Sequence, residues 1–216
     1  MSTIDFIGGE KGGVGKSVVA RLVAQYAIDL SSFESADEIM GLATEADLRV
    51  VVDLPAQSER LLLSWIIETG VLDLARETNV TVAFWHVIDD GKDSVITLDR
   101  LLKRLGSSVR WRIVKNHGRG KDFTLFDRSP TRAAAVALGA RIIDVPGLHA
   151  ATMAKIDRVG AGFWAAVHDP AVGAETFTAM DRQRIKLWLQ AAHDQFAPAF
   201  AFRGSRGAPP RPKGRP

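Results

Sequence analysis

The sequence predicts an α/β protein whose mostly parallel sheet is flanked by helices, and two observations lead to this fold class. Short apolar runs rich in β-branched residues alternate with segments of helical periodicity along residues 1–200. The first of these runs, Ile4–Ile7, leads into the glycine-rich segment Gly9–Ser17 and then into a helical pattern. A strand, a glycine loop and a helix in this order are typical of a loop that wraps around a phosphate group.

The loop reads Gly9-Glu10-Lys11-Gly12-Gly13-Val14-Gly15-Lys16-Ser17. Its glycines let the backbone turn tightly and direct successive N–H groups toward an anion. Lys16 adds a charge that can reach the β- and γ-phosphates, and the Ser17 hydroxyl is a ligand for Mg²⁺. The strict pattern G-x-x-x-x-G-K-[ST] requires glycine at position 10, where this chain has Glu10 and adds Lys11. The alternative is an ordinary glycine-rich turn, which would not be expected to carry Gly-Lys-Ser between a strand and a helix.

The remaining elements follow in alternation. Strands are predicted where apolar β-branched residues cluster, at 49–53, 80–88, 110–116 and 141–145. Helices are predicted from 3.6-residue periodicity at 17–29, 35–46, 58–69, 93–105, 130–138, 150–164 and about 180–196. Residues 1–200 are therefore predicted to form one nucleotide-binding domain.

Ligands of open parallel sheets bind at the carboxyl ends of the strands. Asp53 closes the Val-Val-Val strand and suits a metal-holding acid beside the phosphate loop, although a turn or capping aspartate is the alternative. Gln57 follows in the loop that would contact the γ-phosphate. Asn116 can bind adenine through its amide, and Val145-Pro146 can form the other wall of a base pocket.

Three polar residues lie at or near the end of the predicted strand 80–88: His86, Asp89 and Asp90. No nucleophile accompanies them, so we interpret them as loop or interface residues.

The charge distribution divides the chain into a body, residues 1–200, and a basic tail, residues 201–216. The 216 residues carry a net charge of +3 and no cysteine, which excludes disulfides and cysteine-held metal clusters. Residues 201–216 carry five cations and no acid, so residues 1–200 carry −2. This segment is rich in proline and glycine and is predicted to be disordered, with either a solubility role or contact with DNA, another nucleic acid or an acidic surface. No signal peptide or membrane span is expected, and a cytoplasmic location follows.

Lys11-Gly12-Gly13-Val14-Gly15-Lys16-Ser17 resembles the deviant Walker A loop of the ParA/MinD superfamily of P-loop ATPases. Val52-Asp53-Leu54-Pro55 resembles its Walker B and switch II region, and Asn116 and Asp144-Val145-Pro146 match the segments that hold adenine. Stretches such as 86–94 and 180–184 are most similar to plasmid mobilisation and conjugation members.

The resemblance implies a cytoplasmic ATPase that binds ATP with Mg²⁺ and forms a nucleotide-dependent homodimer. Such a protein would position DNA or another cargo, with a protein partner in a mobilisation or partition system. Lys11 would reach the phosphates of the partner subunit and act with Asp53 in catalysis, while Ser17 and Asp53 would hold the metal. The implied nucleotide contacts are Lys11, Gly12, Gly13, Val14, Gly15, Lys16, Ser17, Val18, Asn116, Val145 and Pro146.

One departure from the family concerns residues 30–48. The family has a second strand there, ending in an aspartate that aligns the attacking water, and this strand is predicted to be missing. Hydrolysis is therefore expected to be impaired. Two alternatives follow: a nucleotide-gated binding module with little hydrolysis, and an ATP-dependent ligase or synthase on the same scaffold.

Overall fold

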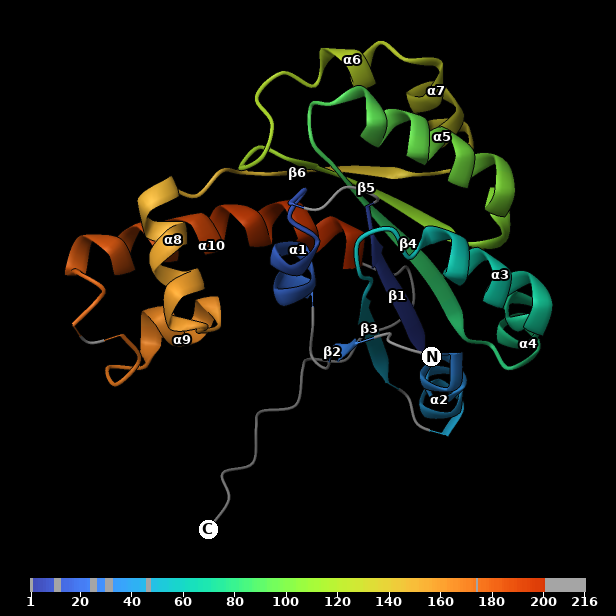
Figure 1. The fold of residues 1–216 in the computed structure, drawn as a ribbon, viewed down its shortest axis with the longest axis horizontal. Helices are drawn as coiled ribbons and strands as arrows, with labels where there is room; N and C mark the ends of the chain where they lie inside the picture. Colours follow the sequence, from blue (N-terminus) through green and yellow to red (C-terminus); the bar gives the residue numbers. More distant parts are fainter. Residues whose placement is uncertain are drawn as a thin grey trace.

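The computed structural model describes residues 2–9, 13–23, 27–29, 33–45, 48–173 and 175–200. These residues form a parallel sheet with helices on both faces (Figure 1). The α/β class and the helix-flanked parallel sheet predicted from the sequence are thereby confirmed. The basic tail, 201–216, lies outside the described residues.

The sheet has six strands in the order β2-β3-β1-β4-β5-β6, and every pairing is parallel. The strands are β1 (Thr3–Gly8), β2 (Ala27–Asp29), β3 (Arg49–Asp53), β4 (Thr81–Ile88), β5 (Arg110–Asn116) and β6 (Arg141–Val145). The chain leaves β1 for β2 and β3 on one side and then crosses to β4 on the other. The strand order thus reverses around β1, which is where ligand crevices form in open sheets.

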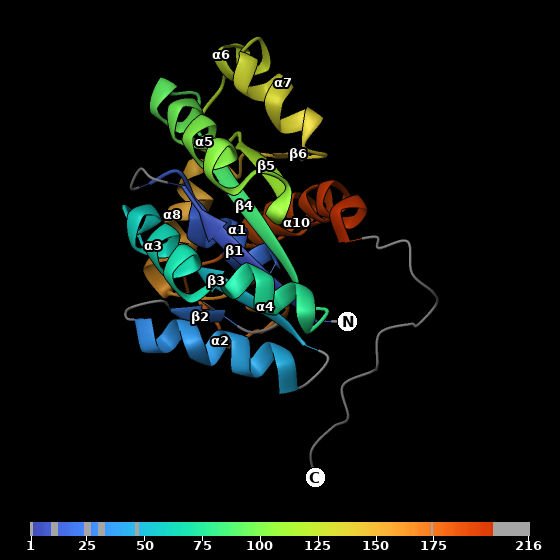
Figure 2. The ribbon, with the colours of Figure 1, turned by 90° about the vertical axis from the view of Figure 1, so that its right-hand side faces the viewer.

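Each face of the sheet buries its own core because successive strand residues point to opposite faces. In β1, Phe6 joins one core while Ile7 joins the other. The first core is covered by α2 (Phe33–Glu45), α3 (Glu59–Thr69), α4 (Val71–Glu77), α5 (Lys92–Leu105), α6 (Thr124–Asp127) and α7 (Pro130–Ala137). The second is covered by α1 (Lys16–Val23), α8 (Ala150–Val159), α9 (Phe163–His168) and α10 (Ala179–Phe200). In Figure 1 the two sets of helices lie on opposite sides of the strands, and in Figure 2 the first set faces the viewer.

The prediction of a missing second strand is wrong. A three-residue strand, β2, pairs with β3 at the edge of the sheet and ends at Asp29, in register with Asp53. The sequence analysis placed residues 17–29 in one helix, whereas α1 ends at Val23. A short edge strand has too few residues to show alternation, and its pairing with β3 is a tertiary contact that periodicity does not detect.

Two other helical boundaries differ from the predictions. The helix predicted over 150–164 is broken at Gly160, which adopts φ 65°, and α9 begins after Gly162. A separate helix, α4, follows Gly70, which is left-handed at φ 62°. In both places glycine ends a helix in the conformation that it adopts most readily.

The last helix begins with a reciprocal cap. The Thr178 backbone N–H donates to Asp181 Oδ2 at 3.0 Å, while the Asp181 backbone N–H donates to Thr178 Oγ1 at 3.1 Å. Lys155 of α8 also binds the Asp181 carboxylate, at 2.6 Å. This contact fixes α10 against α8 and presents Ile185, Trp188 and Phe196 to the core. Among the described helices, none has the length and apolar character needed to cross a membrane.

Candidate functional site

The described part of the glycine loop turns through two positive-φ glycines before α1 begins. Gly13 has φ 90° and Gly15 has φ 92°, and Val14 between them is buried. The Gly15 carbonyl accepts the first helical hydrogen bonds, from the N–H groups of Val18 and Val19. No acidic residue lies in the first turn of α1, so its positive end faces the loop uncompensated within that turn. Glu10, Lys11 and Gly12 lie outside the described residues.

Lys16 is a lysine buried at the start of a helix. Its side chain is 8% exposed, and burial lowers the pKa of its ammonium while the Asp53 carboxylate opposes that shift. A buried ammonium is costly unless anions lie near it. This arrangement suits a lysine that faces the phosphates of a bound nucleotide.

Asp53 ends β3 directly beside β1, in register with Ile7. Its Oδ1 atom is buried and has no hydrogen-bond partner among the described residues. An orphaned carboxylate oxygen close to Lys16, with the exposed Ser17 nearby in α1, fits a Mg²⁺ ion held together with phosphate oxygens and water. Asp29 ends the neighbouring strand in the same register, so three strand ends converge on this edge.

Asn116 lies where the sequence analysis placed it, at the end of β5, but it binds the glycine loop. Its Nδ2 donates to the Val14 carbonyl at 2.7 Å, and its Oδ1 accepts the Gly118 N–H at 3.0 Å. The side chain is 4% exposed. A Cβ atom at Gly15 would lie 2.1 Å from Nδ2, so this contact requires glycine there. Asn116 therefore connects the carboxyl end of β5 to the phosphate loop.

A pocket of about 250 Å³ lies beside this connection. Asn116 and Pro146, both predicted to hold adenine, line it together with Val18. Val145 does not line it and is instead 1% exposed in the core, because alternate residues of β6 face opposite sides of the sheet. The floor of the pocket includes Trp188, whose Nε1 donates to the Pro146 carbonyl at 2.6 Å.

Two charged residues that line this pocket were not predicted from the sequence. Arg119 follows Asn116 in the β5–α6 loop, and Asp157 projects from α8, where Arg21 contacts it at 3.4 Å. Both are ordinary surface charges in the sequence. Only the packing of α8 against α1 and of the loop against Gly15 brings them to one pocket.

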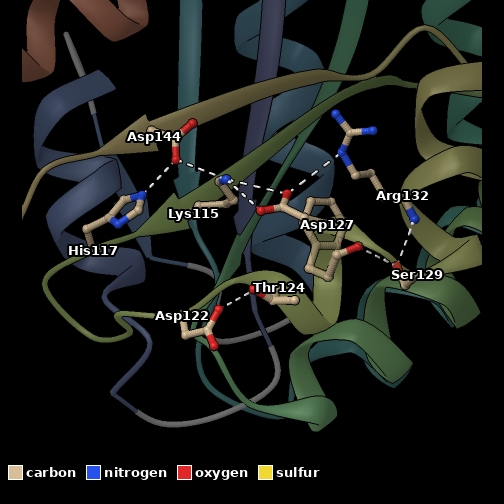
Figure 3. A network of polar contacts seen from close by, with 9 residues as sticks. Lys115, His117, Asp122, Thr124, Asp127, Ser129, Arg132 and Asp144 are labelled. Carbon is tan, nitrogen blue, oxygen red and sulfur yellow. Dashed lines mark hydrogen bonds and ion pairs between the residues drawn. The ribbon is translucent and has the colours of Figure 1, made fainter.

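An ionic network holds the β5–α6 loop that carries Arg119 (Figure 3). Lys115 bridges Asp127 at 3.3 Å and Asp144 at 3.2 Å, joining β5 to α6 and β6. His117 Nε2 lies 2.7 Å from Asp144 Oδ1. The loop beside the pocket is thus fixed from both sides.

Gln57 and the polar residues after β4 lie in loops, where backbone conformation and hydrogen bonds fix their positions. Gln57 adopts φ 63° in the loop after Asp53, a conformation that costs a non-glycine residue energy. Asp89 accepts the hydroxyl of Ser94 at 2.6 Å, and Asp90 accepts the N–H of Lys121 at 2.9 Å, which ties the β4 loop to the β5 loop. This agrees with the interpretation of Asp89 and Asp90 as loop residues. For His86 the interpretation is wrong, because the residue lies within β4 and is fully buried.

Comparisons of the chain with models of known protein families, with curated proteins and with solved structures found no match.

Proposed function

We propose that this chain is an ATP-binding, ParA/MinD-like P-loop ATPase that acts as a nucleotide-dependent dimerisation switch in plasmid or DNA mobilisation, segregation or cargo positioning. One observation carries the nucleotide-binding part of the proposal. The loop after β1 places the buried Lys16 near Asp53, whose buried Oδ1 atom has no hydrogen-bond partner in the described part of the chain, and a base-sized pocket lies beyond Asn116.

Different residues of the site would contact the phosphates, the metal ion and the base of the nucleotide. The backbone N–H groups around Gly13 and Gly15, with Lys16, would bind the phosphates, and Ser17 and Asp53 would hold Mg²⁺. When bound, Mg²⁺ neutralises charge on the phosphate oxygens. The pocket beside Asn116 would receive the base, and Lys11 would reach the phosphates of a second subunit.

The presence of β2 bears on hydrolysis. The sequence predicts impaired turnover on the ground that the strand with the water-aligning aspartate is absent, whereas β2 is present. Since β2 ends at Asp29, in register with Asp53, an acid is available at that strand end. A missing strand therefore no longer favours a binding module without turnover. We propose instead that the chain hydrolyses ATP and that Asp29 aligns the attacking water.

Calorimetric titration with ATP–Mg²⁺ and light scattering after size exclusion in ADP, ATP and a non-hydrolysable analogue test the proposal. Lys16→Ala should abolish ATP binding, because the loss of an ammonium that faces the polyphosphate removes several kcal/mol, roughly. Lys11→Ala should still bind ATP as a monomer but lose the ATP-dependent dimer. Equal loss of binding in both variants would show that Lys11 acts within its own subunit. A ligase product formed from ATP would instead support the metabolic alternative.

A further inference from the structure

The pocket beside the phosphate loop has walls that are mostly apolar. Residues of α1, the loop after β6, α8 and α10 contribute these walls: Val18, Pro146, Leu148, Met153 and Trp188. Apolar walls can hold the faces of a purine ring, but a few polar groups provide the specificity of such pockets. The choice of base therefore depends on the polar groups that reach the pocket.

Several polar groups around the pocket are already hydrogen-bonded within the protein. The Asn116 amide contacts both the Val14 carbonyl and the Gly118 N–H, and its side chain is almost completely buried. Trp188 Nε1 and the Pro146 carbonyl bind each other at 2.6 Å. These bonds hold segments of the protein together, so the groups that make them contribute little to base selection.

Arg119 and Asp157 are the charged residues among the described residues that line the pocket. Arg119 comes from the β5–α6 loop, where its Cγ atom lies 3.8 Å from the position that a Cβ atom at Gly15 would take. Asp157 comes from α8. A guanidinium group only donates hydrogen bonds, and a carboxylate only accepts them. The pocket thus offers one donor and one acceptor from two separate elements.

Arg21 of α1 holds the Asp157 carboxylate in place. Its Nη2 atom lies 3.4 Å from Asp157 Oδ1, its Nε donates to the Ser17 carbonyl at 3.2 Å, and its guanidinium lies 4.7 Å from the centre of the Phe163 ring. The contact uses Oδ1 and leaves Oδ2 without a hydrogen bond to any described residue. Both side chains are partly exposed, and such ion pairs add little to stability. The pair therefore contributes little to the fold, and its carboxylate is open to a ligand.

Adenine carries the hydrogen-bonding pattern that these two side chains complement. Its 6-amino group donates, and the neighbouring ring nitrogen N7 accepts. A purine with an oxygen at position 6, such as guanine, presents an acceptor there, which a carboxylate repels. Given the proposed nucleotide-binding function, on which this inference rests, we propose that Asp157 selects adenine by accepting its 6-amino group. Arg119 donates to the ring nitrogen beside that group, and Arg21 is the positioning residue for Asp157.

The test compares calorimetric titrations of the full chain with ATP, inosine triphosphate and GTP in the presence of Mg²⁺. Inosine triphosphate carries an oxygen in place of the 6-amino group of ATP. The wild type should bind ATP about 10- to 100-fold more tightly than inosine triphosphate, because a hydrogen bond to a charged group contributes about this much. Asp157→Ala should lose most of this preference. Asp157→Asn should bind inosine triphosphate at least as tightly as ATP, because its amide can donate to the oxygen.

The control is Asp73→Asn. Asp73 pairs with Arg76 at 2.7 Å within α4, an exposed aspartate–arginine pair on the other face of the sheet, so its loss should leave the preference unchanged. Arg21→Gln should lower the preference for ATP and leave the affinity for inosine triphosphate nearly unchanged. Urea unfolding checks that each variant is folded, and Asp157→Asn, which keeps the shape of the side chain, serves if Asp157→Ala is unstable.

Three results would overturn base selection by Asp157. They are equal affinity of the wild type for ATP and inosine triphosphate, tighter binding of GTP than of ATP, and a preference in Asp157→Ala equal to that of Asp73→Asn. If Lys16→Ala abolishes the binding of all three nucleotides in such a case, the proposed nucleotide-binding function stands and only the role of Asp157 is wrong. Failure of the wild type to bind any of the three nucleotides would overturn both proposals.

Discussion

The two positive-φ glycines of the phosphate loop provide a matched pair of substitutions. Gly13 and Gly15 adopt nearly the same φ, 90° and 92°. A Cβ atom at Gly13 would meet no atom of the described residues within 4 Å, whereas at Gly15 it would lie 2.1 Å from Asn116 Nδ2. Gly13→Ala therefore measures backbone strain alone, and Gly15→Ala measures the same strain together with displacement of Asn116.

The expected difference follows from the contacts of Asn116. Placing alanine in the left-handed region costs about 1–2 kcal/mol of unfolding free energy at either glycine. At Gly15, the displaced Asn116 also loses its hydrogen bonds to the Val14 carbonyl and the Gly118 N–H, both at buried or part-buried positions. Unsatisfied buried polar groups cost about 1–3 kcal/mol. We expect a loss of about 1–2 kcal/mol for Gly13→Ala and about 2–5 kcal/mol for Gly15→Ala.

Urea unfolding followed by tryptophan fluorescence measures both losses. In an Asn116→Ala background the clash is absent, so Gly15→Ala should cost only the backbone term, and the double-mutant cycle should show a coupling of about 1–3 kcal/mol. Equal destabilisation by Gly13→Ala and Gly15→Ala, or strict additivity with Asn116→Ala, would refute the assigned contact between Asn116 and the loop.

Three other predictions concern acidic residues. Asp53→Asn should weaken ATP binding at least tenfold, about 1.4 kcal/mol, in the presence of Mg²⁺ and much less in its absence, as calorimetry with and without the metal would show. Asp29→Ala should slow phosphate release roughly a hundredfold with ATP affinity unchanged, and an unaltered rate would exclude the β2 end from hydrolysis. Asp181→Asn should lower the free energy of unfolding by about 2 kcal/mol at pH 7. Because the contacts with Lys155 and Thr178 hold the pKa of Asp181 far below its usual value, its stabilisation is complete above about pH 4, the ordinary pKa of an unfolded aspartate, and is lost progressively at lower pH. The difference between wild type and Asp181→Asn should therefore shrink on acidification, and a constant difference would contradict this role.

Features that depend on local composition can be predicted from residue type and spacing alone. The glycine loop between β1 and α1, the strands that end at Asp53 and Asn116, and the core side of α10 all follow from residue type and spacing. Turn chemistry and periodicity act over a few residues, so the chain carries this information locally. The phosphate-loop interpretation itself rests on that local pattern.

Features that depend on neighbours distant in the chain become visible only in the folded protein. The strand ending at Asp29 exists through its pairing with β3, because three residues carry no periodic pattern of their own. Asn116 binds the Val14 carbonyl across 102 positions of sequence, a contact that fixes the loop and that no local pattern encodes. Arg119 and Asp157 are separate surface charges in the sequence. They line one pocket because α8 packs beside α1 and the β5–α6 loop packs against Gly15.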